Sequence, residues 1–165
     1  MKLDQFYTKP KVAKKCYDFM LLKLPRLGVK NPYFIEPSAG LGSFFNLLDA
    51  DKRIGFDIEP RGKGIKKQNF LIWRHDGKKN AVVIGNPPFG KRAKLAIEFF
   101  NKSAEFAHTI GFILPVQFRK YSVHSKLNPD YKLIAEKILP KNSFITENGD
   151  DFNVNCVFQV WTKKD

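Results

Sequence analysis

The order in which strand-like and helix-like segments follow one another constrains the fold of this chain more than any other feature. Short runs of β-branched and aromatic residues, of which residues 81–85 are the clearest, alternate with segments whose apolar residues recur every three or four positions. Strands separated by helices in this way are typical of an α/β sheet with helices on both faces. The sequence therefore predicts an α/β fold.

The expected elements can be placed along the chain by this periodicity. We expect helices over residues 10–24, 41–48, 92–107 and 130–138, and strands over residues 33–36, 53–57, 81–85, 110–114, 144–145 and 154–161. The pattern over residues 65–71 leaves helix and strand open. No repeat, low-complexity tract or linker divides the 165 residues, so residues 1–165 are interpreted as a single domain.

The chain has no sign of a membrane segment, an export signal or a metal site. Its apolar runs are far shorter than the roughly 20 residues that a spanning helix needs, and its first residues lack a secretory pattern. Cys16 and Cys156 have no neighbours at metal-ligand spacing and are expected to be free thiols. We therefore expect an intracellular, cytoplasmic protein in a reducing compartment.

The charge of the chain is strongly positive. Lys and Arg number 29 against 16 Asp and Glu, which gives a formal net charge of +13. A surplus of this size attracts polyanions, because neutralised phosphates release their condensed counterions. The charge favours nucleic acid as a partner, and a basic but inert surface is the alternative.

A turn of small residues follows the first expected strand. Gly40 and Gly42 let a ligand approach the backbone closely, and Asp57 ends the next strand, where an acidic side chain accepts hydrogen bonds from ribose hydroxyls. Phe45 stands where the third glycine of a dinucleotide site would be, and Glu36 would repel phosphates. The pattern favours S-adenosylmethionine, a cationic adenosine ligand, over a dinucleotide. A tight turn that binds nothing is the alternative.

Asn86, Pro87, Pro88 and Phe89 follow directly after the strand at residues 81–85. The two prolines make the turn rigid and leave it carbonyl oxygens rather than N–H donors. If the Asn86 side-chain oxygen and the Pro87 carbonyl accept the hydrogens of an aryl or amide nitrogen, that nitrogen can present its lone pair to an electrophilic methyl group. Phe89 would stack on the base. A structural turn is the alternative.

Four segments together resemble the S-adenosylmethionine-dependent N6-adenine methyltransferases of DNA and RNA. They occur in the family's order: Asp4-Gln5-Phe6-Tyr7-Thr8 with Pro10, residues 36–42, residues 56–58, and Asn-Pro-Pro-Phe at residues 86–89. The resemblance covers most of the chain. It implies a Rossmann-like methyltransferase sheet of seven strands, mostly parallel, with an antiparallel last strand.

The resemblance also implies the site residues. Cofactor contacts of the methionine half would be Phe6, Tyr7, Thr8, Glu36, Ala39, Gly40 and Gly42, with Pro37 beside them; Asp57 would bind the ribose and Ile58 would lie beside the adenine. Asn86, Pro87, Pro88 and Phe89 would form the catalytic turn, with Asn86 also close to the cofactor.

Two features depart from the family pattern. The family usually has Asp-Phe-Leu after the third strand, and its carboxylate accepts a hydrogen from the adenine amino group of the cofactor. Here Asn69-Phe70-Leu71 occupies that place, so Asn69 and Phe70 are expected cofactor contacts with a weaker, uncharged hydrogen bond. Restriction methyltransferases also carry a target-recognition region, for which this chain has no room, so an activator or recognition subunit is a partner to consider.

Basic residues near the expected site are candidates for binding nucleic acid. Lys91 and Arg92 follow the Asn-Pro-Pro-Phe turn, and Arg119 and Lys120 lie in a stretch of mixed basic and aromatic residues that could bind phosphates and stack on bases. An exposed connecting loop is the alternative for that stretch.

The leading interpretation is an enzyme that transfers a methyl group from S-adenosylmethionine to N6 of adenine in DNA or RNA. A protein glutamine N5-methyltransferase is the nearest alternative, because an amide nitrogen poses the same lone-pair problem, although relatives of that kind usually have Tyr after the two prolines. A catalytically silent nucleic-acid-binding module of the same fold is the third interpretation.

Overall fold

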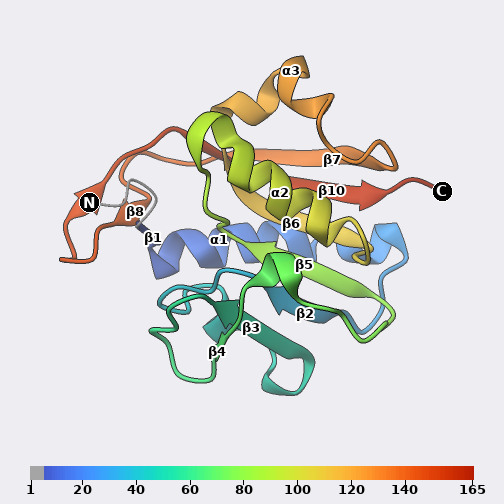
Figure 1. Ribbon diagram of the computed structural model, residues 1–165, viewed down its shortest axis with the longest axis horizontal. Helices are drawn as coiled ribbons and strands as arrows, with labels where there is room; N and C mark the ends of the chain where they lie inside the picture. Colours follow the sequence, from blue (N-terminus) through green and yellow to red (C-terminus); the bar gives the residue numbers. More distant parts are fainter. Residues whose placement is uncertain (1–5) are drawn as a thin grey trace.

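A seven-stranded sheet runs through the computed structural model, which describes residues 6–165 (Figure 1). Its strand order is β4-β3-β2-β5-β6-β10-β7. The strands are β2 (Tyr33–Glu36), β3 (Arg53–Asp57), β4 (Lys66–Lys67), β5 (Ala81–Gly85), β6 (Thr109–Pro115), β7 (Tyr131–Ile138) and β10 (Cys156–Lys163). Strand β10 is antiparallel to both of its neighbours, and the pairs from β4 to β6 are parallel. The predicted α/β sheet with an antiparallel last strand is confirmed.

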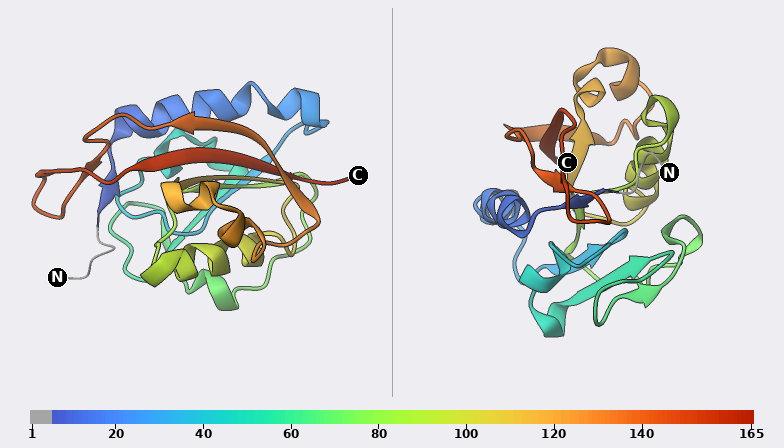
Figure 2. Two further views of the ribbon diagram at one scale, coloured as in Figure 1. Left: turned by 90° about the horizontal axis from the view of Figure 1, so that it is seen from above. Right: turned by 90° about the vertical axis from the view of Figure 1, so that its left-hand side faces the viewer.

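Helices cover both faces of this sheet. Helix α1 (Pro10–Leu21) lies on one face, and α2 (Lys94–Ser103) and α3 (Tyr121–His124) lie on the other (Figure 2). Helix α1 packs through apolar residues at helical spacing, including Val12, Cys16 and Met20. The 3₁₀ helices are Leu24–Leu27, Phe45–Leu47, Ala50–Lys52, Phe70–Ile72, Lys91–Ala93 and Val116–Arg119.

A second, three-stranded sheet joins the beginning of the described chain to its C-terminal part. Strand β1 (Tyr7–Thr8) pairs with β8 (Phe144–Ile145), which pairs with β9 (Asp151–Phe152). Lys9 and Asp151 form an ion pair at 2.8 Å. The small sheet thereby fixes β1 beside the carboxyl ends of the main strands. Asp4 and Gln5 of the first family-like segment lie outside the described residues.

The helix predicted over residues 130–138 is wrong, because these residues form the edge strand β7. In its pairing with β10, Ala135 faces Val160 and Leu133 faces Trp161, so Ile134 is an additional residue in the ladder. The bulge interrupts the two-residue alternation. Apolar residues then fall at spacings of three and four, and this spacing imitates a helix.

The helix predicted over residues 41–48 is also wrong, apart from the single 3₁₀ turn Phe45–Leu47. The Arg53 guanidinium donates hydrogen bonds to the carbonyls of Phe45 and Leu48, at 3.0 and 3.2 Å, and a continuing helix would need these carbonyls. Phe44 packs in the main core, whereas Phe45 packs in a separate cluster with Ala39 and Ile65. Neighbouring side chains of this segment therefore pack in two separate clusters, unlike the single buried face of an amphipathic helix.

Other predicted elements differ only in extent. Helix α2 begins at Lys94 instead of residue 92, because Arg92 and Ala93 have φ values of 54° and 60°, in the left-handed region. The open segment 65–71 contains both strand β4 and the start of the 3₁₀ helix Phe70–Ile72. Residues 144–145, expected to close the main sheet, belong to the small sheet instead.

Burial dominates the chemistry of the two thiols. Cys16 and Cys156 are free and buried, and burial raises the pKa of each thiol to about 12. Within residues 6–165 no helix combines the length and the apolar character that crossing a membrane requires.

Candidate active site

A cavity of about 520 Å³ opens at the carboxyl edge of the parallel strands, which is where α/β sheets bind ligands. Strand β1 forms one wall, and the segments after β2, β3 and β5 form the others. Its lining includes Phe6, Tyr7, Pro37, Gly40, Asp57, Ile58, Phe70, Asn86, Pro87, Pro88 and Phe89, all of them predicted site residues. Segments distant in the sequence are therefore brought together as expected.

A smaller cavity of about 30 Å³ adjoins the first and shares Phe6, Tyr7, Gly40 and Asn86 with it. Thr8, Glu36 and Ala39, the remaining residues predicted for the methionine half, line this smaller space. Gly42 lines neither cavity. Its N–H donates to the Ala39 carbonyl at 2.8 Å, and its φ of 93° serves the turn.

Glu36 is a carboxyl group buried beneath the glycine turn, with 2% of the residue exposed. One oxygen accepts the Ser38 N–H at 2.9 Å. Burial raises the pKa of Glu36 to about 8; the Ser38 hydrogen bond opposes this shift, and the charge of Asp57 adds to it. A buried carboxyl group with a single hydrogen bond is suited to pair with a cation.

Asp57 joins the glycine turn to the segment after β3. One carboxylate oxygen accepts the Gly40 N–H at 2.8 Å and the other accepts the Glu59 N–H at 2.9 Å. Each oxygen can accept a further hydrogen bond, so the residue can still receive hydroxyl donors from the cavity. The Tyr7 ring covers Gly40 so closely that an added Cβ there would lie 3.0 Å from it.

Hydrogen bonds hold Asn86 at its side-chain nitrogen and at its backbone carbonyl. Its Nδ2 donates to Thr8 Oγ1 at 3.2 Å, and its backbone carbonyl accepts the Ser38 hydroxyl at 2.9 Å. Its Oδ1 is the one buried side-chain nitrogen or oxygen atom in residues 6–165 without a hydrogen-bond partner. Leaving such an acceptor unpaired costs about 1–3 kcal/mol. The oxygen keeps its capacity to accept hydrogen bonds, at a residue that lines both cavities.

Phe89 forms an apolar wall of the cavity. Only 8% of it is exposed, and its ring meets Phe6 edge to face at 5.6 Å. Its carbonyl accepts the N–H groups of Leu95 and Ala96 at 3.0 and 3.1 Å, at the start of α2. The turn at residues 86–89 is therefore anchored to the following helix.

Asn69, expected to contact the cofactor, lies outside both cavities. It is exposed, it lines neither cavity, and its Oδ1 accepts the Leu71 N–H at 3.0 Å. It therefore caps the short 3₁₀ helix that follows. Its neighbour Gln68 lines the larger cavity instead.

Several residues that line the larger cavity were not among the predicted cofactor or catalytic residues, namely Ser38, Glu59, Arg61, Gln68, Leu95 and Phe99. Arg61 also forms an ion pair at 2.6 Å with Glu147, in the connection between β8 and β9. Ser38, inside a segment already singled out, was the easiest of these to find. The pair with Glu147 joins residues 86 positions apart, a separation that no local pattern indicates.

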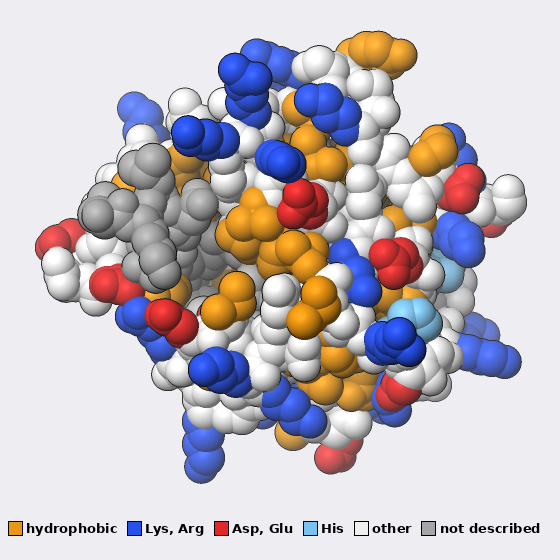
Figure 3. All heavy atoms as spheres, viewed as in Figure 1, with side chains coloured by type: hydrophobic (Ala, Val, Ile, Leu, Met, Phe, Trp, Pro, Cys, Tyr) orange, Lys and Arg blue, Asp and Glu red, His pale blue; other side chains and the backbone are white. Residues whose placement is uncertain are grey.

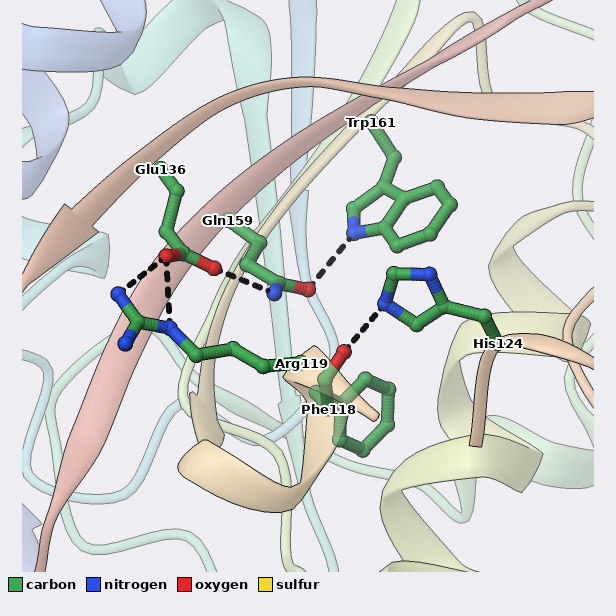
Figure 4. A network of polar contacts seen from close by, with 6 residues as sticks. All are labelled: Phe118, Arg119, His124, Glu136, Gln159 and Trp161. Atoms are coloured by element: carbon green, nitrogen blue, oxygen red, sulfur yellow. Dashed lines mark hydrogen bonds and ion pairs between the residues drawn. The ribbon is translucent and has the colours of Figure 1, made fainter. Parts of the chain in front are cut away.

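None of the four basic candidates lines either cavity. Lys91, Arg92 and Lys120 are exposed and form no ion pair within residues 6–165. Arg119 donates to Glu136 Oε1 from Nε at 2.8 Å and from Nη2 at 2.5 Å (Figure 4). Figure 3 shows apolar side chains in the middle of one face, with Lys and Arg distributed around them.

The Arg119 pair belongs to a polar network outside the cavity (Figure 4). Glu136 Oε2 accepts the Gln159 amide at 2.8 Å, and Gln159 Oε1 accepts the Trp161 indole N–H at 2.9 Å. Burial acts to raise the pKa of Glu136, but the hydrogen bonds from Arg119 and Gln159 outweigh it, so that the pKa is lowered. The network fastens the segment after β6 to β7 and β10.

Metal ligands are not grouped in the described part of the chain. Within residues 6–165, no cluster of three or more His, Cys, Asp or Glu side chains could hold a metal ion.

Similar folds occur in solved structures of methyltransferases. One is a protein of Pyrococcus horikoshii provisionally named an RNA methyltransferase: TM-score 0.65, 12% identity, 92% of this chain and 85% of that one. Another is the type I restriction enzyme EcoKI M protein, EC 2.1.1.72: TM-score 0.59, 19% identity, 98% of this chain and 45% of that one. The chain has the Rossmann-like methyltransferase fold.

A third similar structure is the E. cuniculi Mtq2-Trm112 complex, responsible for methylation of the eRF1 translation termination factor. Its TM-score is 0.57 at 15% identity, covering 96% of this chain and 99% of that one. Neither a family model nor a curated protein sequence matches this chain. Because the sequence identities to these structures are low, the similarity establishes the fold alone. It does not identify the substrate atom that would receive a methyl group.

Proposed function

We propose that the chain is an S-adenosylmethionine-dependent methyltransferase that methylates the exocyclic N6 amine of adenine in DNA or RNA. The observation that carries the proposal is the Asn86 Oδ1 atom, which is buried and unpaired at a rigid turn in the cavity wall. An N–H hydrogen of the substrate amine would supply the missing partner. A catalytically silent module would give no reason to keep this acceptor unpaired.

The cavity supports the choice of cofactor. Its volume of about 520 Å³ falls within the range of small-molecule sites. Glu36 would face the cationic methionine end, Asp57 the ribose, and Ile58 with Phe70 the adenine. S-adenosylmethionine would supply a methyl group bonded to a positively charged sulfur, and Glu36 in its ionised form would stabilise that charge.

The chain's own residues would act on the nitrogen that receives the methyl group. Asn86 Oδ1 and the Pro87 carbonyl would each accept one N–H hydrogen, which directs the nitrogen lone pair toward the methyl group. Phe89 would contact the face of the base. The nitrogen–carbon bond would form as the sulfur–carbon bond breaks, the sulfur would keep that bond's electron pair and become an uncharged thioether, and the surplus proton of the nitrogen would pass to water.

Nucleic acid is favoured as the substrate by the net charge of +13 and by Phe89, since protein glutamine methyltransferases usually carry Tyr at that position. Protein glutamine N5 methylation is the second candidate, because the E. cuniculi Mtq2 protein has this fold over nearly its whole length and an amide nitrogen needs the same acceptors. That structure also contains Trm112, and an activator or recognition subunit belongs to the proposal as well.

Methyl transfer from labelled S-adenosylmethionine to DNA, RNA or polypeptide tests the proposal. We expect label in nucleic acid, and N6-methyladenosine or its deoxy form after digestion and mass spectrometry. Label in polypeptide as glutamine N5-methylation would support the second candidate. Failure to label any of the three substrates, with and without a cell extract that supplies a partner subunit, would overturn both.

A further inference from the structure

Two hydroxyl side chains hold Asn86 from opposite parts of the chain. Ser38 Oγ donates to the Asn86 carbonyl at 2.9 Å, and Thr8 Oγ1 accepts from Asn86 Nδ2 at 3.2 Å. The partners lie 48 and 78 positions away from Asn86. These contacts therefore depend on the tertiary structure and not on the turn's own sequence.

Each hydroxyl residue is itself fixed. Thr8 is paired with Phe144 in the small sheet, and its carbonyl accepts the Ser43 hydroxyl at 2.5 Å. The backbone N–H of Ser38 donates to the buried Glu36 carboxyl at 2.9 Å. A hydroxyl residue that is itself held in place restricts the position of its hydrogen-bond partner more than a mobile side chain does.

The side-chain amide of Asn86 has two unlike ends of similar shape. The oxygen accepts hydrogen bonds, whereas the nitrogen donates them, and a half-turn of the amide exchanges the two. A substrate amine needs an acceptor, so the oxygen must face the cavity. In this structure Thr8 Oγ1 accepts from the nitrogen end, and the oxygen end is the one without a partner within residues 6–165. A hydroxyl group can serve either end of an amide, so this contact fixes the plane of the Asn86 side chain.

We infer that Thr8 and Ser38 are positioning residues for the Asn86 turn. Thr8 holds the plane of the side-chain amide, and Ser38 holds the carbonyl that precedes Pro87. The inference rests on the proposed function, and it deepens that proposal: residues on the cofactor side of the cavity set the geometry of the group that receives the substrate nitrogen.

Turnover of matched variants tests this inference. Thr8→Val and Ser38→Ala should each lower kcat by about 10- to 100-fold, because a displaced acceptor loses its alignment. The Kd of S-adenosylmethionine should stay within about threefold in Ser38→Ala, since this variant keeps the backbone N–H to Glu36. Thr8→Ser retains a hydroxyl group and should restore kcat to within about threefold of the wild type.

Ser103→Ala is the matched control. Ser103 is fully buried, and its hydroxyl donates to the Phe99 carbonyl at 2.8 Å inside α2, so the variant also loses a side-chain hydrogen bond to a carbonyl. It should leave kcat unchanged. An unchanged kcat in Thr8→Val and Ser38→Ala would overturn the inference, as would a loss of cofactor affinity as large as the loss of kcat in both.

A second measurement needs no turnover. In the free protein, the Asn86 side-chain amide hydrogens should exchange with water at least about 10-fold faster in Thr8→Val than in the wild type, by NMR. The Asn101 amide, bonded to the Lys126 carbonyl at 3.0 Å, is the internal reference. Equal exchange rates would overturn the role of Thr8. If the wild type methylates nothing, the proposed function fails, and amide exchange still decides this inference.

Discussion

The two halves of the main sheet differ in how many hydrogen-bond partners their buried polar groups have. At the carboxyl ends of β2, β3 and β5, Asn86 Oδ1 has no partner among the described residues 6–165, and Glu36 receives one N–H in a buried site. In the half formed by β6, β10 and β7, the fully buried Gln159 uses its amide nitrogen for Glu136 and its oxygen for Trp161.

This difference separates function from stability. A buried polar group with its partners in place stabilises the fold, whereas one without them costs free energy unless a ligand supplies them. Substitutions in the cavity half should therefore reduce activity and spare stability. Substitutions in the network half should do the reverse. Variants in both halves of the sheet test this separation.

Asn86→Ala should have the largest effect. Losing one fixed dipole that acts on the reacting group costs about 100- to 1000-fold in kcat. The substitution removes both the Nδ2–Thr8 hydrogen bond and the Oδ1 atom that has no partner within residues 6–165, and these two effects oppose each other. The free energy of unfolding should therefore change by no more than about 1 kcal/mol, and the Kd of S-adenosylmethionine should stay within a few-fold. Single-turnover kinetics, urea unfolding and calorimetry measure the three quantities. A variant that keeps a tenth of the wild-type turnover would contradict the prediction.

Glu36 should make both stability and cofactor binding depend on pH. Its folded pKa of about 8 lies above the ordinary carboxyl value of 4.5, so the folded protein holds a proton that the unfolded chain releases. This contribution to stability is fully present below pH 4.5 and is lost as the pH rises to about 8. Urea unfolding between pH 5 and 8 should show this decline in the wild type and not in Glu36→Gln.

The folded protein without cofactor favours the protonated form of Glu36. A bound cationic cofactor should instead favour the ionised carboxylate. Its affinity should increase with pH toward 8, by up to about 10-fold per pH unit. The amino group of the cofactor titrates in a similar range, so the comparison with Glu36→Gln, which keeps that titration, isolates the protein's contribution. Parallel pH profiles for the two proteins would show that Glu36 does not bind the cation.

The cavity half is also the half that the sequence predicts well. Strands at residues 33–36, 53–57 and 81–85 were predicted with their observed bounds, because each is a short apolar run that ends at turn residues. Parallel strands bring their carboxyl ends to one edge, so the segments that follow them must meet there. The positions of Glu36, Asp57 and Asn86 follow from this rule.

In the network half, the strands predicted at residues 110–114 and 154–161 are confirmed as β6 and β10 to within two residues, and β7 was missed for a physical reason. The bulge at Ile134 gives the sequence of β7 the apolar spacing of a helix. Because β7 was predicted as a helix, the Glu136 carboxylate was not expected near the segment that follows β6. Without it, Arg119 looked like a free cation suited to phosphate. Similarly, the pairing of β1 with β8 joins residues more than 130 positions apart, and only tertiary packing determines that pairing.

Glu136→Ala should destabilise the fold with little effect on catalysis. It removes the acceptor of Arg119 and of the Gln159 amide, and a hydrogen bond to a charged group is worth about 1.5–3 kcal/mol. The Arg119 side chain is 44% exposed, so water compensates in part and a loss of about 1 kcal/mol is expected. Urea unfolding measures this loss, and kcat per folded molecule should stay within about twofold.

Asp18→Ala is the control for that variant, since its pair with Lys14 is a surface contact at 2.9 Å, with both side chains more than half exposed. It should lose less than about 0.5 kcal/mol. Equal destabilisation by the two variants would mean that the network contributes no more than an ordinary surface ion pair.

The smallest effects should come from the basic candidates, and here Arg119 should behave unlike Lys91. Lys91→Ala should weaken nucleic-acid binding a few-fold and lower the slope of log K against log salt by about 0.7–0.9, because one fewer counterion is released. Arg119→Ala combined with Glu136→Ala keeps the net charge, since the two side chains neutralise each other at 2.5 Å. Fluorescence titrations at several salt concentrations should give this double variant the wild-type slope. If its slope falls as much as that of Lys91→Ala, Arg119 leaves Glu136 to bind phosphate, and the network half takes part in substrate binding as well as in stability.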